Sequence, residues 1–195
     1  MEADLSDLSG LIERWQQGHQ AAAEAIYNRC RGLTYGLAYA LLNDSADAEE
    51  VTQDALTYAL THINQYNSHQ ARFTTWLHTI TVSRCRNKRR RHFLPSVSFL
   101  AWFKGGGDQA DPIPSPERQT LQNYVRHEVG TALQSLSQPL REAILLRYWA
   151  DYTYPEIGVI LGCSARVARS RVLAAHEQLA LLLAHDDLIS LEESI

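Results

Sequence analysis

A stretch rich in proline and glycine divides this chain of 195 residues into two parts. Four of the six prolines lie between residues 93 and 117, together with the run Gly105–Gly106–Gly107. Prolines and consecutive glycines interrupt regular structure, so the stretch predicts a linker between two folded units. Its first half carries many large apolar side chains, which indicates either folding back on the first unit or binding in a groove of a partner.

Both parts show the periodicity of helices. In the first part, helices are expected over residues 7–31, 33–42 and 44–63, and a fourth begins at Phe73 and becomes almost purely basic. In the second part, they are expected from about 117 to 136, 137 to 149 and 153 to 161, and from Ser164 onward. The sequence therefore predicts an all-α protein of two small helical domains, residues 1–92 and 118–185. A flexible linker, residues 93–117, would join them, and an acidic tail, residues 186–195, would follow.

Charge is distributed unevenly along the chain, although the formal net charge is only −4. Residues 1–54 hold ten acids and three bases, whereas residues 55–104 hold eight bases and no acid. Local charge rather than the total attracts a polyanion, and a solvated helix face would mix both signs. The basic segment is therefore expected to bind nucleic acid.

The sequence lacks the signals of several other classes of protein. The three cysteines, Cys30, Cys85 and Cys163, are odd in number and far apart, which excludes a disulfide framework and favours small core residues. The eight histidines form no metal-binding pair, and no glycine-rich phosphate loop precedes a helix, so no enzyme, metal or cofactor is expected. No apolar run reaches the roughly 20 residues of a membrane span, and the acidic N-terminus is unlike a signal peptide. A cytoplasmic protein without membrane insertion is expected.

The last two predicted helices form a helix-turn-helix pattern. Thr153 and Glu156 make a capping box that opens the short helix, and Gly162 begins the turn. At about 100° per residue, one face of the long helix is a buried stripe of Ala168, Val172, Ala175 and Leu179. The opposite face carries Arg166, Arg169, Ser170 and Leu173, which suit guanine edges, phosphates and a thymine methyl. Arg171 flanks the core side, where it fits a backbone phosphate. This helix is expected to recognise DNA.

Two further patterns lie in the first part. Tyr66, Phe73 and Trp76 precede the basic run Arg84–Arg91, a combination that suits a splayed single strand, although the spacing of Phe73, Trp76 and Ile80 also fits a core. The acidic helix over 44–56 is either a capped, solvated helix start or a docking surface for a basic partner. Spacing alone does not decide between these interpretations.

In this order, the elements resemble an extracytoplasmic-function (ECF) sigma factor of bacterial RNA polymerase, over roughly residues 10–92 and 118–183. The acidic motif of the family reads here as Asp47-Ala48-Glu49-Glu50-Val51-Thr52-Gln53-Asp54. An aromatic residue, a Trp-Leu pair and a basic helix end follow as Phe73, Trp76-Leu77 and Asn87-Lys88-Arg89-Arg90-Arg91. The second domain matches from Leu136 to Tyr148, and its helix pair matches at Tyr154-Pro155-Glu156-Ile157 and Arg169-Ser170-Arg171.

The resemblance implies a function and a set of partners. The protein would direct RNA polymerase core to promoters, docking on the clamp helices of the largest subunit and the flap of the second-largest, and an anti-sigma factor or other regulator would control it. Polymerase would be bound by Asp47, Glu49, Glu50, Gln53 and Asp54. The −10 element would be recognised and melted by Tyr66, Arg72, Phe73, Trp76, Ser83, Arg84, Asn87, Lys88, Arg90 and Arg91. The −35 element would be read by Arg166, Arg169, Ser170, Arg171 and Leu173.

Departures from the family pattern point to altered promoter preferences. Arg166-Val167-Ala168 stands where Gly-Thr-Val is usual, Leu173-Ala174 stands where basic residues are usual, and Ser83 replaces a common asparagine. An alternative function is a sigma-like interaction module that captures an anti-sigma partner and never binds DNA. The acidic tail is hypothesised to shield a basic DNA face in the free protein.

Overall fold

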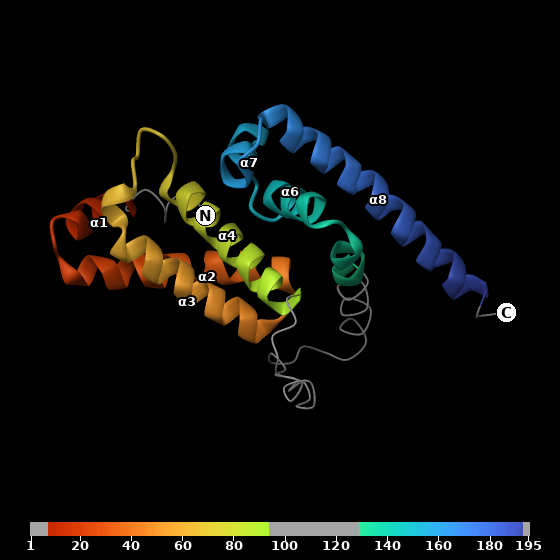
Figure 1. The fold of residues 1–195 in the computed structure, drawn as a ribbon, viewed down its shortest axis with the longest axis horizontal. Coiled ribbons are helices and arrows are strands. Elements are labelled where there is room, and N and C mark those ends of the chain that lie inside the picture. The colour runs from red at the N-terminus through yellow and green to blue at the C-terminus, as the bar shows by residue number, and fades with distance from the viewer. Residues whose placement is uncertain (1–7, 94–128, 193–195) are drawn as a thin grey trace, which may run out of the picture.

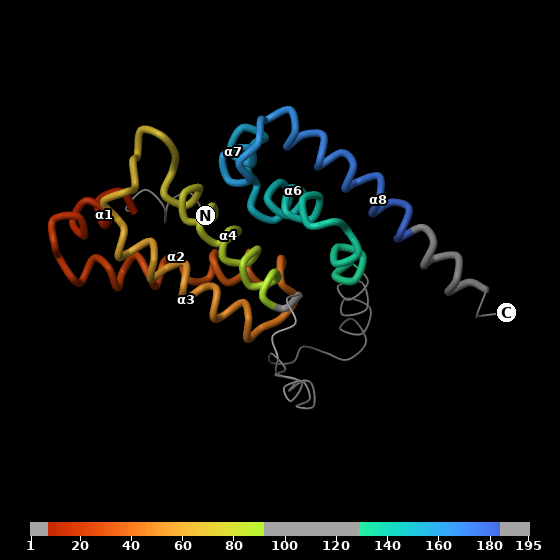
Figure 2. The backbone as a smooth tube through the Cα atoms, in the orientation of Figure 1, coloured from red at the N-terminus to blue at the C-terminus, as the bar shows by residue number. Residues whose placement is uncertain are grey.

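The computed structural model describes residues 8–93 and 129–192, and side chains up to residues 91 and 183 of these two segments. Figures 1 and 2 show that both segments are built from helices joined by short turns, with no strand in either. The prediction of an all-α protein of two helical domains is therefore confirmed. The apolar half of the linker, the first helical residues after it and the side chains of the acidic tail lie outside the described residues.

Three helices lie side by side in the first domain: α2 (Gln20–Leu42), α3 (Ser45–Thr61) and α4 (Phe73–Phe93). The short helix α1 (Leu8–Gln16) and the 3-10 turn η1 (Ile63–Gln65) close one end of this bundle. The core there is formed by apolar side chains from all of these elements, among them Leu11, Ile26, Leu56, Ile63 and Leu77. Removing such surface from water is the main stabilisation available to a small helical bundle.

The helix break in the N-terminal region lies elsewhere than predicted. The sequence pattern was interpreted as one helix over 7–31 and a second over 33–42, but α1 ends at Gln16 and α2 runs without interruption to Leu42. The turn depends on Gly18, whose φ of +91° is a conformation that only glycine adopts easily. Gly32 remains inside α2, so the predicted break there is wrong.

The second domain contains a helix over 129–135, then α6 (Gln138–Tyr148), α7 (Tyr154–Leu161) and α8 (Ala165–Glu192). The predicted capping box is present: the Glu156 carboxylate accepts hydrogen bonds from the Thr153 N–H at 2.9 Å and from its hydroxyl at 2.7 Å. Gly162, with φ of +68°, ends α7, and a Cβ on Gly158 would lie 2.6 Å from the Cys163 carbonyl oxygen. The tight approach of the two helices therefore needs both glycines. Residues 186–192, the first part of the predicted acidic tail, continue α8.

Arg141 is a buried structural arginine of the second domain. Its side chain, only 5% exposed, donates to the carbonyl oxygens of Leu133, Gln134 and Leu136 at 2.5–2.7 Å. The first two carbonyls belong to the end of helix 129–135 and that of Leu136 follows it directly, where the chain has no further helical donors. Arg141 thus fixes this helix to α6.

The two domains pack against each other. Figure 1 shows α6 and α7 beside α4, and one apolar cluster joins side chains of both domains, including Leu37, Val82, Leu146 and Ile157. Tight packing of this kind positions the two candidate DNA-binding helices relative to one another.

Candidate nucleic-acid interface

The face of α8 that was predicted to recognise DNA is exposed. Ala168, Val172 and Ala175 are fully buried against α6 and α7, as the helical angles predict, whereas Leu179, the last residue of the predicted stripe, is only partly buried. Arg166, Arg169 and Ser170 are exposed on the other side, and Leu173 is 49% exposed. The predicted division of this helix into a buried and an exposed face is therefore confirmed.

A hydrogen bond from the backbone caps the start of α8, and its exposed arginines form no ion pair with the described acids. The Ser164 hydroxyl accepts a hydrogen bond from the Val167 N–H at 3.3 Å and caps α8. Arg171 is half-buried, with Nη1 3.8 Å from Cys163 Sγ, which matches its predicted place beside the core. No acid among the described residues pairs with Arg166 or Arg169. Two such guanidinium groups on one turn can bind guanine edges or phosphates.

The basic residues of α4 point in different directions. Arg90 and Arg91 are exposed at the end of the helix, and Arg90 Nη2 lies 3.4 Å from Asn87 Oδ1. Ser83 is exposed and Asn87 half-buried, and with Arg90 they line an open groove between α4 and the start of α6. Arg84 covers the ring of Tyr58 in the first domain, 5.1 Å from the ring centre. Only part of the basic run therefore faces solvent.

Lys88 connects α4 to the acidic helix α3. Its Nζ lies 3.1 Å from Asp47 Oδ1 and 2.5 Å from Glu50 Oε2. Burial by itself lowers the pKa of Lys88, but the hydrogen bonds to Glu50 and Asp47 outweigh it, and the pKa is raised overall. Two of the residues predicted to bind polymerase thus contact one residue predicted to bind DNA.

The other predicted polymerase-binding residues lie on the same helix. Glu49 pairs with Arg31 of α2 at 3.0 Å and accepts a hydrogen bond from Gln53 Nε2 at 3.2 Å. Gln53 and Asp54 are exposed. The side chain of Asp44 caps α3 by accepting from the Asp47 N–H at 2.8 Å, so this acidic surface begins at a well-defined helix end.

The predicted aromatic residues form one cluster at the start of α4. The ring of Tyr66 contacts Phe73 edge-on and Trp76 at a tilt, with ring centres 5.3 and 5.6 Å apart. Phe73 is only 4% exposed, so it is a core residue, whereas Tyr66 and Trp76 are partly exposed. Beside Tyr66, α1, η1 and the loop over 66–70 line an open polar cleft of about 680 Å³. A partly exposed ring that lines a cleft, as that of Tyr66 does, suits an unstacked base.

Arg86 and Arg89 belong to the basic run but were not among the predicted DNA contacts, and both bind the second domain. Arg86 makes a two-point ion pair with Glu142, at 2.9 and 2.6 Å, and these hydrogen bonds, against the effect of burial, raise the pKa of Arg86. Gln138 also donates to Glu142, at 2.8 Å. Arg89 Nη2 donates to the Leu41 carbonyl at 2.8 Å and to Gln134 Oε1 at 2.7 Å, and burial lowers its pKa.

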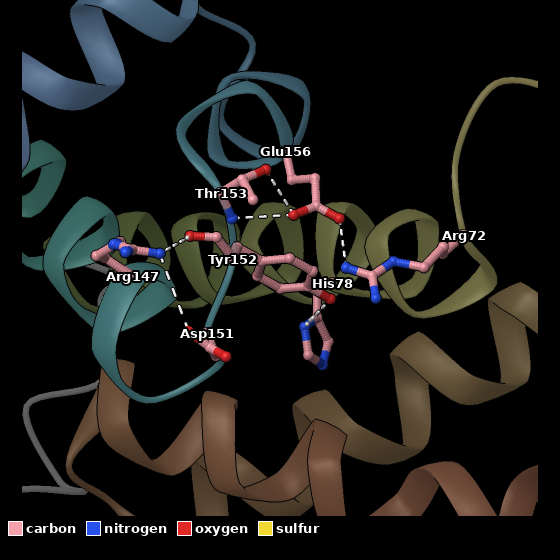
Figure 3. A network of polar contacts seen from close by, with 7 residues as sticks. All are labelled: Arg72, His78, Arg147, Asp151, Tyr152, Thr153 and Glu156. Carbon is pink, nitrogen blue, oxygen red and sulfur yellow. Dashed lines mark hydrogen bonds and ion pairs between the residues drawn. The ribbon is translucent and has the colours of Figure 1, made fainter. Parts of the chain in front are cut away.

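A second group of polar contacts joins the domains at the other end of α4 (Figure 3). Arg72, a predicted DNA contact, pairs with Glu156 of the capping box. His78 Nδ1 and Tyr152 Oη lie 2.9 Å apart and share a hydrogen bond. Burial lowers the pKa of His78 to about 4 and raises that of Tyr152. Arg147 donates to the Tyr152 carbonyl at 3.0 Å and holds the segment in place.

Among the described residues, no three His, Cys, Asp or Glu side chains are grouped as metal ligands. In the same part of the chain, no helix has the length and apolar composition of a membrane span.

Two sequence families match the two domains. Residues 26–93 match Sigma-70 region 2, and residues 126–179 match Sigma-70, region 4. The chain is 31% identical over 173 residues to the ECF RNA polymerase sigma-E factor of Escherichia coli K12, covering 86% of this chain and 89% of that protein. It is 28% identical over 172 residues to the RNA polymerase sigma-H factor of Pseudomonas aeruginosa, with the same shares covered.

Solved structures share the fold. CnrH in complex with the cytosolic domain of CnrY superposes with a TM-score of 0.67 at 22% identity, over 90% of this chain and 96% of that one. The sigma factor RpoE from Bartonella quintana, in complex with the anti-sigma factor NepR, superposes with a TM-score of 0.58 at 24% identity, over 79% and 91%. The arrangement of helices is therefore one that solved proteins also adopt.

Proposed function

The chain belongs to the ECF sigma factors of RNA polymerase, and from this premise we propose how its residues divide promoter recognition among them. Membership of the family gives the chain its role: it directs RNA polymerase core to promoters, as a binding subunit rather than an enzyme. Its partners are the polymerase core and promoter DNA. The proposed division assigns residues 1–92 to the −10 element and the polymerase clamp, and residues 118–185 to the −35 element.

The exposed face of α8 carries the proposal for the −35 element. Arg166 and Arg169 would bind base edges in the major groove, Ser170 and Arg171 would bind phosphates, and Leu173 would contact a thymine methyl. The supporting observation is that all of these side chains except the half-buried Arg171 lie on the solvent side of a helix whose other side is buried. A module that bound only a regulator would have no need of unpaired arginines on this face.

The −10 element is assigned to α4 and the cleft before it. Arg72, Arg84, Lys88, Arg90 and Arg91 would hold phosphates, while Ser83 and Asn87 would contact bases. Tyr66 and Trp76 would stack on unpaired bases, and the cleft beside Tyr66 would receive one of them. Phe73, although in the predicted set, would act by supporting these rings, because it is buried. Unstacking costs a few kcal/mol per step, which contacts to polymerase would offset.

The acidic helix α3 is assigned to polymerase, and the cytoplasm is the corresponding site of action. Asp47, Glu49, Glu50, Gln53 and Asp54 would bind basic residues of the clamp helices, and the second domain would contact the flap. Because the similar solved structures are complexes with CnrY and with the anti-sigma factor NepR, an anti-sigma factor or a comparable regulator is proposed here as well.

The proposal is tested by transcription with purified core polymerase on genomic fragments, followed by promoter binding with altered protein. Replacing Arg166 or Arg169 with Ala should cost about 1–3 kcal/mol of promoter affinity and relax the preference at one −35 position. Arg14→Ala, at an exposed arginine of α1, is the matched control and should leave both unchanged. An equal loss on every DNA sequence would mean that these arginines contact phosphates only. A lack of promoter-dependent transcripts would contradict the function itself.

A further inference from the structure

Three arginine side chains meet at a small cavity between α4 and α6. Together with one apolar residue of α2, its lining consists of Cys85, Arg86 and Arg89 of α4 and of Gln138, Arg141 and Glu142 of α6. The cavity has a volume of about 10 Å³, which is room for one particle of the size of a water molecule. Glu142 is the only acid in this lining, so three positive charges face one negative charge there.

Arg141 brings an unpartnered donor to the cavity. Its side chain is 5% exposed, and its Nε and Nη2 donate to carbonyl oxygens of the segment 133–136. These carbonyls belong to residues outside the cavity lining, so Nη1 is the nitrogen that remains to face it. Nη1 is buried and has no hydrogen-bond partner among the described residues. Leaving a donor of a buried cation unpaired is costly, so we expect a partner that the chain itself does not supply.

The other two arginines differ in how their charge is compensated. Glu142 accepts two hydrogen bonds from Arg86, through Nε and Nη2, and a third from Gln138. Arg89 donates through Nη2 to two neutral acceptors, a backbone carbonyl and a side-chain amide oxygen. Burial accordingly lowers the pKa of Arg89, whereas the hydrogen bonds to Glu142 raise that of Arg86. One carboxylate therefore neutralises one guanidinium group, and the charges of Arg89 and Arg141 lack a counter-ion among the described residues.

The size and charge of the cavity decide which ligand it can take. A water molecule would fit and would accept a hydrogen bond, but it would leave the buried positive charge uncompensated. A cation is repelled by this lining, and a polyatomic anion such as phosphate or sulfate needs more room than one water molecule. A monoatomic anion is small enough, accepts hydrogen bonds from several directions and supplies the missing negative charge.

We propose that this cavity is a halide-binding site, in which one chloride ion accepts a hydrogen bond from Arg141 Nη1 and lies beside the guanidinium groups of Arg86 and Arg89. Hydrogen bonds between charged groups are stronger than those between neutral groups. The open groove between α4 and the start of α6 provides a route from the solvent, since three of its lining residues also line the cavity. Because the site exists only where α4 and α6 hold the arginines together, the ion stabilises the folded chain.

Chloride binding is tested first in solution with the full chain. Urea denaturation is measured while sodium gluconate is replaced by sodium chloride at constant ionic strength, because gluconate is too large for the cavity and general screening stays the same. The free energy of unfolding should rise with the chloride concentration, and the chloride NMR line should broaden when protein is added and narrow again when bromide displaces the ion. Equal stability in the two salts would overturn the proposal.

Two variants make this test specific. Arg89→Gln removes one charge of the cavity and should weaken chloride binding at least about tenfold, because a hydrogen bond or close contact to a charged group is lost. Arg14→Gln, at an exposed arginine of α1, is the matched control and should bind chloride as the unaltered protein does. Circular dichroism confirms that each variant is folded. If both variants lost chloride binding equally, the ion would be attracted by arginines in general, and the proposed site would be refuted.

Crystals grown in sodium bromide locate the ion without any variant, so the proposal stays testable if Arg89→Gln does not fold. The anomalous signal of bromide should give a peak within hydrogen-bond distance of Arg141 Nη1. A water molecule in the cavity and no bromide peak would contradict the proposal. A bromide peak without any chloride effect in solution would mean binding at crystal concentration only and would contradict it as well. None of these measurements uses DNA, so their outcome is independent of the proposed function.

Discussion

Replacing Gly36 with Ala should have opposite effects on the first domain and on the contact between the domains. Gly36 lies inside α2, where alanine is favoured over glycine by about 0.5–1 kcal/mol, so the helix itself should become more stable. The added Cβ, however, would lie 2.3 Å from Cζ2 and 3.0 Å from Cη2 of Trp149. Such distances are too short for two carbon atoms that are not bonded to each other, so the tryptophan ring must move.

The cost of moving this ring follows from its burial. Trp149 is 42% exposed, so somewhat more than half of its surface is covered. A tryptophan buries about 150–250 Å² when fully covered, which at about 25 cal/mol per Å² makes the covered part worth roughly 2–4 kcal/mol. Part of this is contact with its own domain and is retained. We therefore expect Gly36→Ala to weaken the contact between the domains by about 1–3 kcal/mol.

The assay is a double-mutant cycle with Trp149→Ala, read by urea denaturation and by the distance between labels on the two domains. Gly36→Ala alone should open the domains, whereas in the Trp149→Ala background it should only add the helix stabilisation of about 0.5–1 kcal/mol. Gly32→Ala, in the same helix but without a neighbouring side chain within 4 Å, is the matched control and should stabilise in both backgrounds. If Gly36→Ala stabilised the protein as much as Gly32→Ala and left the distance unchanged, the packing of Trp149 on Gly36 would be refuted.

Two other predictions concern stability. Burial lowers the pKa of His78 to about 4, below its usual value of about 6.5, so the folded state takes up this proton less readily than the unfolded state. The free energy of unfolding should therefore be highest above pH 6.5 and should fall by about 3 kcal/mol in total as the pH is lowered from there toward 4. His78→Gln should make the free energy of unfolding less dependent on pH, as measured by urea denaturation at several pH values. Arg141→Ala should lower the free energy of unfolding by at least about 2 kcal/mol in thermal denaturation, since it leaves the carbonyls of Leu133, Gln134 and Leu136 without their donor. Arg141→Lys should not restore this stability, because lysine keeps the positive charge but lacks the forked donors of arginine.

The features that were predicted correctly from the sequence are those formed by residues close together along the chain. The capping box of Thr153 and Glu156 and the two faces of α8 follow from spacings of three and four residues, and both are present in the structure. The contacts between the domains could not be found in this way. Arg86 and Glu142 are 56 positions apart, and Arg72 and Glu156 are 84 apart. No local pattern distinguishes such partners from other charged residues.

The glycines of the first domain show the same limit. Gly18, Gly32 and Gly36 all interrupt apolar helical patterns, and the sequence placed the helix break near Gly32. In the structure, Gly18 makes the turn with a positive φ, Gly36 admits the ring of Trp149, and Gly32 has no close neighbour. Only tertiary contacts separate a glycine that ends a helix from one that permits packing.

The structure explains how the folded protein tolerates a basic segment that contains no acid. A helix with cations at successive turns would repel itself unless other charges neutralised it. In this fold the neutralising acids come from both sides: Asp47 and Glu50 of α3 hold Lys88, and Glu142 of α6 holds Arg86. Because the acids of α3 belong to the surface proposed for polymerase, polymerase docking would release Lys88 of α4 for DNA. In the free protein these carboxylates neutralise part of the positive charge of α4.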